Sequence, residues 1–573
     1  MTQQPFEVGL VMAGAISAGA YTGGALDFLI EALDQWEDAK AAGQDVPPHD
    51  VQLKAIAGAS AGSMCAAIAG TALAYKHTPV HAGNYTTASN PFFQSWVKDI
   101  DISYLLDTAD IDKGQPLRSF LNSDRLLAIV SAVLNTSGEA KTRRYVANPL
   151  AIRLSVGNLK GIPYRIGMAG SAGAGHAMAL HGDNASFLVS ADSQPPVSPP
   201  DWTPLARPNS AATDAWAKFG TAALASGAFP LFLRPRVLSR PTHAGLAARS
   251  FVLPGDGTDH PVHGVSQLLA VPPAWPNPMP PDPYDYLSVD GGIIDNEPLE
   301  MARETLAGKL GRNPRDGKEA KRALLMIDPF VDDVSPGPAG DLAPLKVIGP
   351  LTGAWKNQCR FKPADLALAH MENVYSRFLI APSRDGNAPG QHPCASGGLG
   401  GFLGFFHQEF RVHDYLLGRR NCQHFLRQHF SLPEANKLFD SWTAAQRQAW
   451  AIPDAKAGTH LPIVPLVGSA RETQQPPAWP AGRLDAETLR APIDRRAHAV
   501  FNAMVADLKW LPRQYVRLGW TLGGRGAVVD AAIKAIRDAL EAQRLSRGAL
   551  PTTINRPRGS KRRRFLPRPC PTG

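Results

Sequence analysis

The N-terminal half of the chain alternates between short apolar runs and stretches with helical periodicity. Residues 6–12 (FEVGLVM) form an apolar run with β-branched side chains, as in a buried strand, and a helical pattern covers residues 21–36. Residues 51–57 (VQLKAIA) repeat the strand pattern, and an Ala-rich helix follows the turn at residues 58–63. Strands that alternate with helices in this way predict an α/β sheet covered on both faces.

The pattern changes beyond residue 335. Clear strands become rare, and helical periodicity recurs over residues 365–377, 436–450, 484–508 and 528–543. A helical stretch also lies inside the α/β part, at about residues 76–145, and we interpret it as a packing or lid insertion. The chain is therefore predicted to comprise an α/β domain at residues 5–330 with that insertion, a mostly helical region at 336–550, and a disordered basic tail at 551–573.

One stretch, residues 55–75 (AIAGASAGSMCAAIAGTALAY), has the length and the lack of charge of a membrane-spanning helix. Its Gly and Ser residues gather at the start, in a strand, turn and helix pattern, rather than spreading along a uniform helix. We therefore expect this stretch to be buried inside the α/β domain.

The net charge of +9 comes mainly from the tail. Residues 551–573 hold seven Lys or Arg and no acid, so the rest of the chain carries a net charge of only +2 (9 − 7). A Pro-rich basic segment cannot pack a core, and its simplest interpretation is a solvated end. Its charge also suits peripheral contact with an anionic membrane surface, whereas no nucleic-acid partner is expected.

Five cysteines are scattered along the chain and none forms a C-x-x-C pair, so neither a disulfide framework nor a zinc site is indicated. A reducing compartment fits this usage. The polar start (MTQQPFE) has no basic segment ahead of the first apolar run, which argues against a secretory signal. A cytoplasmic protein is therefore the expectation.

A serine lies in a sharp strand-to-helix turn. Gly58-Ala59-Ser60-Ala61-Gly62 has the G-x-S-x-G form of a nucleophile elbow, with a predicted strand before it and a helix after it. A serine at a helix N-terminus has backbone N–H groups and the positive end of the helix dipole close to its oxygen. The alternative interpretation is a chance Gly/Ser loop in a nucleotide-binding unit.

Two other loops carry candidate groups. Gly14 to Gly19 follows the first strand and offers backbone amides for an oxyanion hole; it fails as a dinucleotide fingerprint, because Ile16 stands where G-x-G-x-x-G requires glycine. Asp290-Gly291-Gly292 places a carboxylate at the end of a predicted strand, where open α/β sheets keep reactive groups. Asn296 is expected to cap a helix at about residues 298–310.

Taken together, these motifs resemble the patatin-like phospholipase family in order and context. The loop block GLVMAGAISAGAYTGG resembles the family's oxyanion segment, and GASAGS resembles its elbow. Residues 225–230 (ASGAFP) resemble the A-S-x-A-x-P stretch, and SVDGGIIDNEP matches the Asp-Gly-Gly block. The resemblance covers the ends of a domain from about residue 5 to 330, and the region after residue 335 lies outside it.

The resemblance implies a patatin-like three-layer sandwich with a mostly parallel central sheet. It also implies a serine acyl hydrolase that cleaves carboxylic esters of lipids, of the phospholipase A or lysophospholipase type, through a Ser-Asp dyad and an acyl-enzyme. Ser60 would be the nucleophile and Asp290 its base. Backbone amides of Gly14, Ala15 and Ile16 would form the oxyanion hole, and a lipid or other ester would be the substrate.

The glycine loop departs from the family pattern G-G-G-x-R/K-G. Ala15 and Ile16 replace two glycines, and Ala18 stands where a basic residue is expected. Backbone amides at these positions can still donate, but the missing cation weakens the case for a phosphate-bearing substrate. The altered loop also supports an alternative function, that of a catalytically silent lipid-binding or scaffold protein.

A Ser-Asp-His esterase is the nearest enzymatic alternative, because a histidine after Asp290 would complete the chain order of an α/β-hydrolase triad. The histidines that qualify by position are His370, His392, His407, His413, His424, His429, His460 and His498. A metal site from His413, Cys422, His424 and His429 is disfavoured, because no pair has the i, i+4 carboxylate context of a hydrolytic site. No metal and no cofactor are predicted.

Overall fold

The structure, a computed structural model, describes most of residues 4–546. Outside the description lie both chain ends and residues 112–115, 169, 171–174, 242–248, 261–262, 279, most of 332–373, 389, 455–457 and most of 507–519. The predicted basic tail lies outside the described residues, as do six of the thirteen residues of the predicted helix at 365–377. Of its described residues, 367–368 are helical and 374–376 are not, and Arg377 begins a strand, so the predicted C-terminal end of this helix is wrong.

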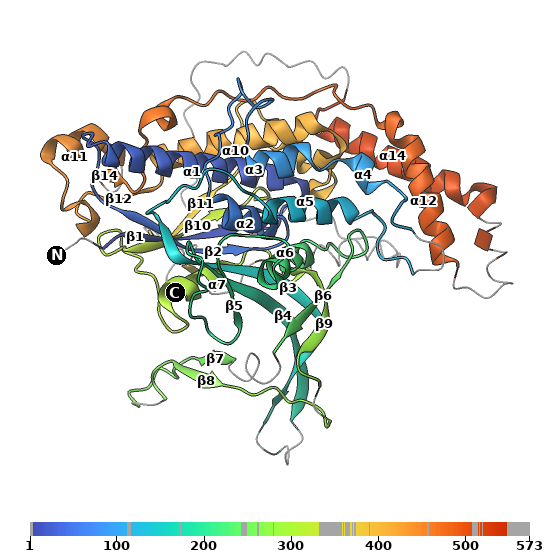
Figure 1. Cartoon of the computed structure of the whole chain (residues 1–573), viewed down its shortest axis with the longest axis horizontal. Helices are drawn as coiled ribbons and strands as arrows, with labels where there is room; N and C mark the ends of the chain where they lie inside the picture. The colour runs from blue at the N-terminus through green and yellow to red at the C-terminus, as the bar shows by residue number, and fades with distance from the viewer. Residues whose placement is uncertain are drawn as a thin grey trace, which may run out of the picture.

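A mostly parallel sheet lies at the centre of the part that the structure describes (Figure 1). Its strand order is β11 (Arg377–Ile380), β10 (Arg322–Ile327), β1 (Phe6–Met12), β2 (Val51–Gly58), β3 (Val146–Ile166), β4 (His176–Val189) and β5 (Trp202–Leu205). Two further strands, β9 (Tyr284–Asp290) and β6 (Arg236–Arg240), join through an antiparallel pairing of β9 with β3. The predicted sandwich with a mostly parallel central sheet is confirmed.

The register of this sheet brings the three candidate loops to one edge. Met12, the last residue of β1, lies opposite Gly58 of β2 and Ile327 of β10. Asp290, the last residue of β9, lies opposite Val156 of β3. The glycine loop and the elbow begin at the carboxyl ends of parallel strands, where open α/β sheets place reactive groups. Strand β9 runs antiparallel to β3, and the Asp-Gly-Gly turn reaches the same edge because Asp290 pairs with Val156.

Helices cover both faces of the sheet. On β1, Leu10 and Met12 pack into the core that contains α1 (Gly19–Ala41), α2 (Ala61–Ala72) and α6 (Asp214–Ser226). Val11 points to the other face, where it packs against α7 (Leu299–Ala307). This alternation along a central strand is why β1 has to be apolar on both sides.

The long apolar stretch at residues 55–75 is internal to the fold. It begins in β2 and continues as α2, in which nearly every residue is buried. In the described part of the chain, no helix is long and apolar enough to cross a membrane. The prediction that this stretch is buried is confirmed.

Helix α10 (Gln408–Gln428) packs on the outer side of α1 and forms a further layer (Figure 1). Two glycines allow the two backbones to approach closely. A Cβ on Gly24 would lie 1.9 Å from the carbonyl oxygen of Tyr415, and a Cβ on Gly418 would lie 2.1 Å from that of Tyr21. Neither position can carry a side chain unless the helices move apart.

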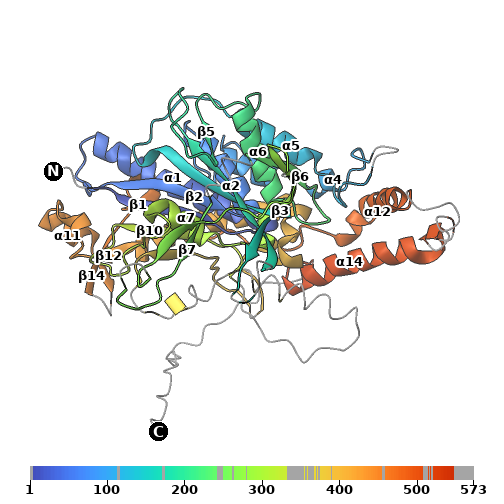
Figure 2. The ribbon, with the colours of Figure 1, turned by 90° about the horizontal axis from the view of Figure 1, so that it is seen from below.

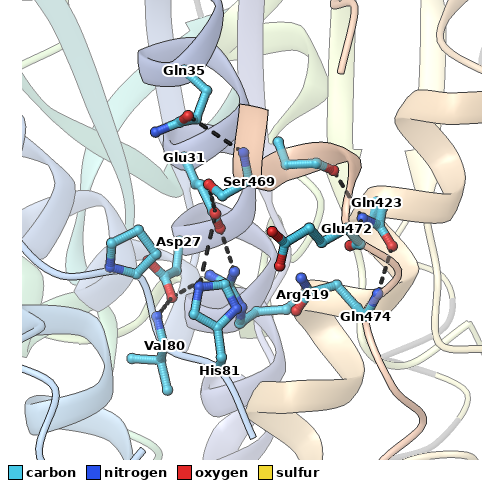
Figure 3. Close-up of polar contacts among 12 residues, drawn as sticks. Asp27, Glu31, Gln35, Val80, His81, Arg419, Gln423, Ser469, Glu472 and Gln474 are labelled. Carbon is cyan, nitrogen blue, oxygen red and sulfur yellow. Dashed lines mark hydrogen bonds and ion pairs between the residues drawn. The ribbon is translucent and has the colours of Figure 1, made fainter. Parts of the chain in front are cut away.

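A buried ion network also joins α1 to the C-terminal region (Figure 3). Arg419 of α10 donates through Nη1 to Asp27 Oδ2 at 2.5 Å and through Nη2 to Glu31, and the three side chains have almost no exposed surface. Ser469 Oγ donates to the second Glu31 oxygen at 2.7 Å. The C-terminal region is thus packed into the same body as the α/β part.

The rest of the C-terminal region combines helices with strands that the sequence pattern did not reveal. Helices α12 (Arg490–Met504) and α14 (Arg525–Ala542) lie side by side at the opposite end of the molecule from α11 (Ala444–Trp450) (Figures 1 and 2). A small sheet contains β12 (Ser431–Pro433), β13 (Ile452–Asp454) and β14 (Gly458–Pro462), and β11 extends the central sheet. Strands of three to five residues are too short to show a period in the sequence.

Candidate active site

Ser60 occupies a strained turn between β2 and α2. Its backbone has φ 49° and ψ −121°, a conformation that L-residues rarely adopt. The turn has no room beside it, because a Cβ on Gly58 would lie 2.6 Å from the Gly62 oxygen, and one on Gly62 would lie 2.1 Å from the Met12 oxygen. The two glycines of the predicted elbow are therefore required sterically.

The structure brings Asp290 to this serine. Ser60 Oγ donates a hydrogen bond to Asp290 Oδ2 at 2.7 Å, although the two residues are 230 positions apart. The other carboxylate oxygen accepts the Gly292 N–H at 2.7 Å. Gly291 passes so close to β3 that a Cβ would lie 2.1 Å from the Ser155 oxygen. The predicted Asp-Gly-Gly turn thus orients the carboxylate toward Ser60.

The environment of Asp290 favours its protonated form. Burial raises the pKa of this carboxyl to about 6, and the hydrogen bonds from Ser60 and Gly292 act in the opposite direction. A carboxylate with a pKa near neutrality is better matched to taking up and returning a proton than one with an ordinary pKa.

A second serine supports the turn. Ser226, at the end of α6, accepts the Ser60 backbone N–H through its Oγ at 3.0 Å and lies 2.7 Å from Ser63 Oγ. The sequence pointed to residues 225–230 only as a matching block and assigned Ser226 no role. The one feature of the sequence that could have indicated this role is the polar Ser226 at an otherwise apolar helix end.

The glycine loop runs beside Ser60. The Gly14 N–H already donates to the Asn296 carbonyl at 3.2 Å, whereas the N–H groups of Ala15 and Ile16 have no acceptor in the described part of the chain. Ile16 has φ 47°, so a β-branched residue occupies left-handed backbone at one of the positions where glycine was expected. Of the three predicted amides, those of Ala15 and Ile16 are free for an oxyanion.

The predicted capping role of Asn296 is wrong. Helix α7 begins after Pro298 and has no side-chain cap. The Asn296 amide instead donates to Glu297 Oε1 at 2.8 Å, and its oxygen would meet a Cβ on Gly14 at 2.3 Å. The side chain packs against the glycine loop, a contact that no local capping pattern could reveal.

The C-terminal region also holds the glycine loop. Ser17 Oγ donates to the Gly401 carbonyl and accepts the Gly404 N–H at 3.0 Å. These residues are nearly four hundred positions apart, and the sequence gave no reason to connect them. A region outside the family resemblance therefore helps to fix the loop next to Ser60.

An apolar cavity opens next to Ser60, and together with the open solvent at its mouth it comprises about 930 Å³. One wall is α2, through Ala67 and Ile68, and another is α5 (Asp124–Leu134), through Val133. Phe405 of the C-terminal region closes a further side. The insertion at residues 76–145 thus contributes wall residues to the cavity, and the described lining is almost entirely hydrocarbon.

The late histidines lie elsewhere in the described part of the chain, where none is hydrogen-bonded to Ser60 or Asp290. His413 Nδ1 lies 2.8 Å from Asp414 Oδ1, and His460 Nδ1 lies 3.2 Å from Ser431 Oγ. His370 lies outside the described residues.

Comparison with known proteins agrees with this geometry. The family model for patatin-like phospholipases matches residues 10–303, just over half of the chain. The uncharacterized protein y4iI of Sinorhizobium fredii (strain NBRC 101917 / NGR234) is 35% identical over 578 residues, which cover 92% of this chain and 80% of that protein. The chain therefore belongs to the patatin-like phospholipase family, a family of lipid acyl hydrolases.

Proposed function

We propose that this protein hydrolyses carboxylic ester bonds of lipids, as a phospholipase A or lysophospholipase, with Ser60 as nucleophile and Asp290 as general base. The observation that carries the proposal is the 2.7 Å hydrogen bond from Ser60 Oγ to the buried Asp290 carboxylate at the side of an apolar cavity. A nucleophile and its base within hydrogen-bond reach, next to space for an acyl chain, suit ester cleavage.

In the first half of the reaction, Asp290 takes the Ser60 hydroxyl proton as Oγ bonds to the ester carbonyl carbon. The carbonyl oxygen becomes an oxyanion, and the Ala15 and Ile16 N–H groups lie on the loop beside Ser60 to stabilise it. When the intermediate collapses, the bond to the alcohol oxygen breaks. Asp290 returns its proton to that oxygen, and the acyl group remains on Ser60.

In the second half, water replaces the alcohol. Asp290 takes a proton from the water as its oxygen attacks the acyl carbon, and the bond from that carbon to Ser60 Oγ then breaks. The proton returns to Ser60, the fatty acid leaves, and the enzyme is restored. One carboxylate therefore serves both halves of the cycle.

The cavity suggests how the acyl chain is held. It extends beside α2 from Ser60 as far as Ile68, a distance of about 12 Å at a helical rise of 1.5 Å per residue. We infer that the hydrocarbon tail lies between α2 and α5 with its ester at Ser60.

The test combines covalent labelling with turnover. A fluorophosphonate probe should label Ser60 in the wild type, and mass spectrometry of a lipid panel should detect released fatty acids. Ser60→Ala should lose both signals and keep its fold, because alanine already flanks this position; the loss of rate should be several orders of magnitude. Retention of more than about a tenth of the wild-type rate, a difference of under about 1.4 kcal/mol, would exclude Ser60 as nucleophile.

Asp290→Asn distinguishes the dyad from a triad. The amide has nearly the shape of the carboxylate but cannot accept a proton, so this variant should lose almost as much activity as Ser60→Ala. No substitution of a late histidine should match it. If the wild type neither binds the probe nor releases fatty acids, the silent lipid-binding alternative takes precedence.

A further inference from the structure

Leu231 combines two unfavourable features. Its side chain is 68% exposed, so it contributes little to the core, and its backbone has φ 69°, in the left-handed region that favours glycine. A large apolar residue that is both exposed and conformationally strained does not stabilise the folded chain by itself. Such strain persists where the surrounding structure enforces it, and it gathers at functional sites.

The surrounding structure does enforce this conformation. The Leu231 carbonyl accepts the Phe120 N–H at 2.8 Å, and the Phe232 carbonyl accepts the Leu121 N–H at 3.0 Å. The rings of Phe120 and Phe232 pack edge to face with centroids 6.1 Å apart. Residues 229–233 are thereby held against the insertion, with Leu231 projecting outward.

This segment lies at the mouth of the acyl cavity. It connects α6 to β6 (Figure 2), and it follows Ser226, the residue that hydrogen-bonds to the Ser60 backbone. Phe229 and Phe232 line the cavity and are also 40% and 41% exposed, so each joins the cavity to the outer surface. With Leu231 between them, they form an exposed apolar rim.

The chain segments that meet at this rim are basic. Residues 117–127 and 229–236 together contain four arginines and one aspartate. Arg118 is exposed, and its side chain has no hydrogen-bond or ion-pair partner among the described residues. Arg125 is paired with Asp99 at 3.2 Å, which leaves the other arginines of these segments to carry the positive charge. Apolar side chains next to cations suit a surface that offers both hydrocarbon and negative charge.

We propose that the rim formed by Phe229, Leu231 and Phe232 docks onto the surface of an anionic lipid aggregate, with Leu231 inserted among the acyl chains. The choice of a lipid surface rests on the proposed function, because an acyl chain that moves from the aggregate into the cavity would then never cross water. The cations at the rim select anionic headgroups, a role that the glycine loop cannot fill because it carries Ala18 where a basic residue was expected.

The test measures co-sedimentation of the full-length protein with phosphatidylglycerol/phosphatidylcholine vesicles and with pure phosphatidylcholine vesicles. All variants carry Ser60→Ala, so that no lipid is consumed. Leu231→Ser and Leu231→Gly should each weaken binding to the anionic vesicles about tenfold, as expected for one leucine withdrawn from hydrocarbon. Leu231→Gly also removes the backbone strain, so a loss of binding without a lower unfolding temperature separates docking from misfolding.

Val197→Ser is the matched control, because Val197 is 99% exposed in the loop between β4 and β5 and should not affect binding. The basic tail is present in every variant, so its contribution cancels when the variants are compared on the same vesicles. Unchanged vesicle binding in both Leu231 variants, or equal binding of the unsubstituted rim to neutral and anionic vesicles, would overturn the proposal. Failure of the proposed chemistry would instead appear as a lack of probe labelling at Ser60, which this binding assay does not involve.

Discussion

Ser60 Oγ lies 2.7 Å from Asp290 Oδ2, and both side chains are nearly inaccessible to solvent. The pair is held from three directions: by the strained elbow after β2, by the Gly292 N–H on the carboxylate, and by Ser226 on the serine backbone. A hydrogen bond fixed in this way sets the relative position of nucleophile and base before substrate binds, which is the condition for efficient proton transfer.

The pH dependence of hydrolysis should report the Asp290 pKa. Burial raises that pKa to about 6, and the carboxylate must be ionised to accept the serine proton. We therefore expect kcat/KM for a soluble ester to rise about tenfold per pH unit up to about pH 6 and to level off above it. An acid limb near pH 4, the ordinary value for Asp, would contradict this assignment.

The raised pKa of Asp290 should also affect stability, which falls as pH rises whereas activity increases. The folded-state pKa lies above the unfolded value, so the folded state binds more protons between about pH 4 and 6, and ionisation of Asp290 lowers stability as pH rises through that window. Asp290→Asn removes this cost and should stabilise the fold at pH 8 by on the order of 3 kcal/mol, since the pKa is raised by about two and each pKa unit is worth about 1.4 kcal/mol. Urea unfolding of both proteins at pH 8 and at pH 4 measures the difference, which should vanish at the lower pH.

The left-handed backbone of Ile16 predicts that glycine at this position gives a more stable protein than alanine, the reverse of the usual order. In ordinary backbone, alanine is more stable than glycine by about 0.5–1 kcal/mol. At φ 47° the Cβ is unfavourable, so Ile16→Gly should be more stable than Ile16→Ala by about 1 kcal/mol, although both lose the isoleucine side chain. Chemical denaturation gives the free energy of unfolding of the two variants. A more stable alanine variant would show that the loop relaxes out of this conformation.

The cavity predicts acyl-chain selectivity. Ala67 is buried and lines the cavity on α2, so the phenyl ring of Ala67→Phe should fill space that a long chain needs. The ratio of kcat/KM for a long-chain to a short-chain ester should fall about a hundredfold, since each excluded methylene is worth about 0.8 kcal/mol. Val133→Ala is the counterpart on α5 and should shift the ratio toward longer chains. If the ratio of long-chain to short-chain kcat/KM in both variants equals that of the wild type, the acyl chain lies elsewhere.

The buried ion network predicts a strong dependence of stability on Arg419. Arg419→Met would leave Asp27 without its counter-charge and Glu31 with only His81, 3.8 Å away, and removing one partner of a buried pair costs about 3–5 kcal/mol. Combining it with Asp27→Asn and Glu31→Gln should restore much of the unfolding free energy. A single variant within about 1 kcal/mol of the wild type, measured by urea unfolding, would mean that water reaches the carboxylates.

Local pattern was sufficient for the parts of this protein that depend on neighbouring residues. The strands β1, β2 and β9, the elbow and the Asp-Gly-Gly turn all follow from apolar periods and from glycines at positions without space for a side chain. The sequence also placed Asp290 at the end of a strand, but β9 runs antiparallel to β3, so its meeting with Ser60 depends on the pairing of Asp290 with Val156 and not on a shared strand direction.

Only the tertiary structure decided what lies between segments distant in the chain. No local period connects the positions that these contacts join: Asn296 with the glycine loop, Ser17 with Gly401 and Gly404, and α1 with α10 in one core. The apolar cavity likewise needs α2, α5 and Phe405 at once. Hydrophobic patterning tells which face of an element is buried, but the identity of its partner is settled by close packing of the whole chain.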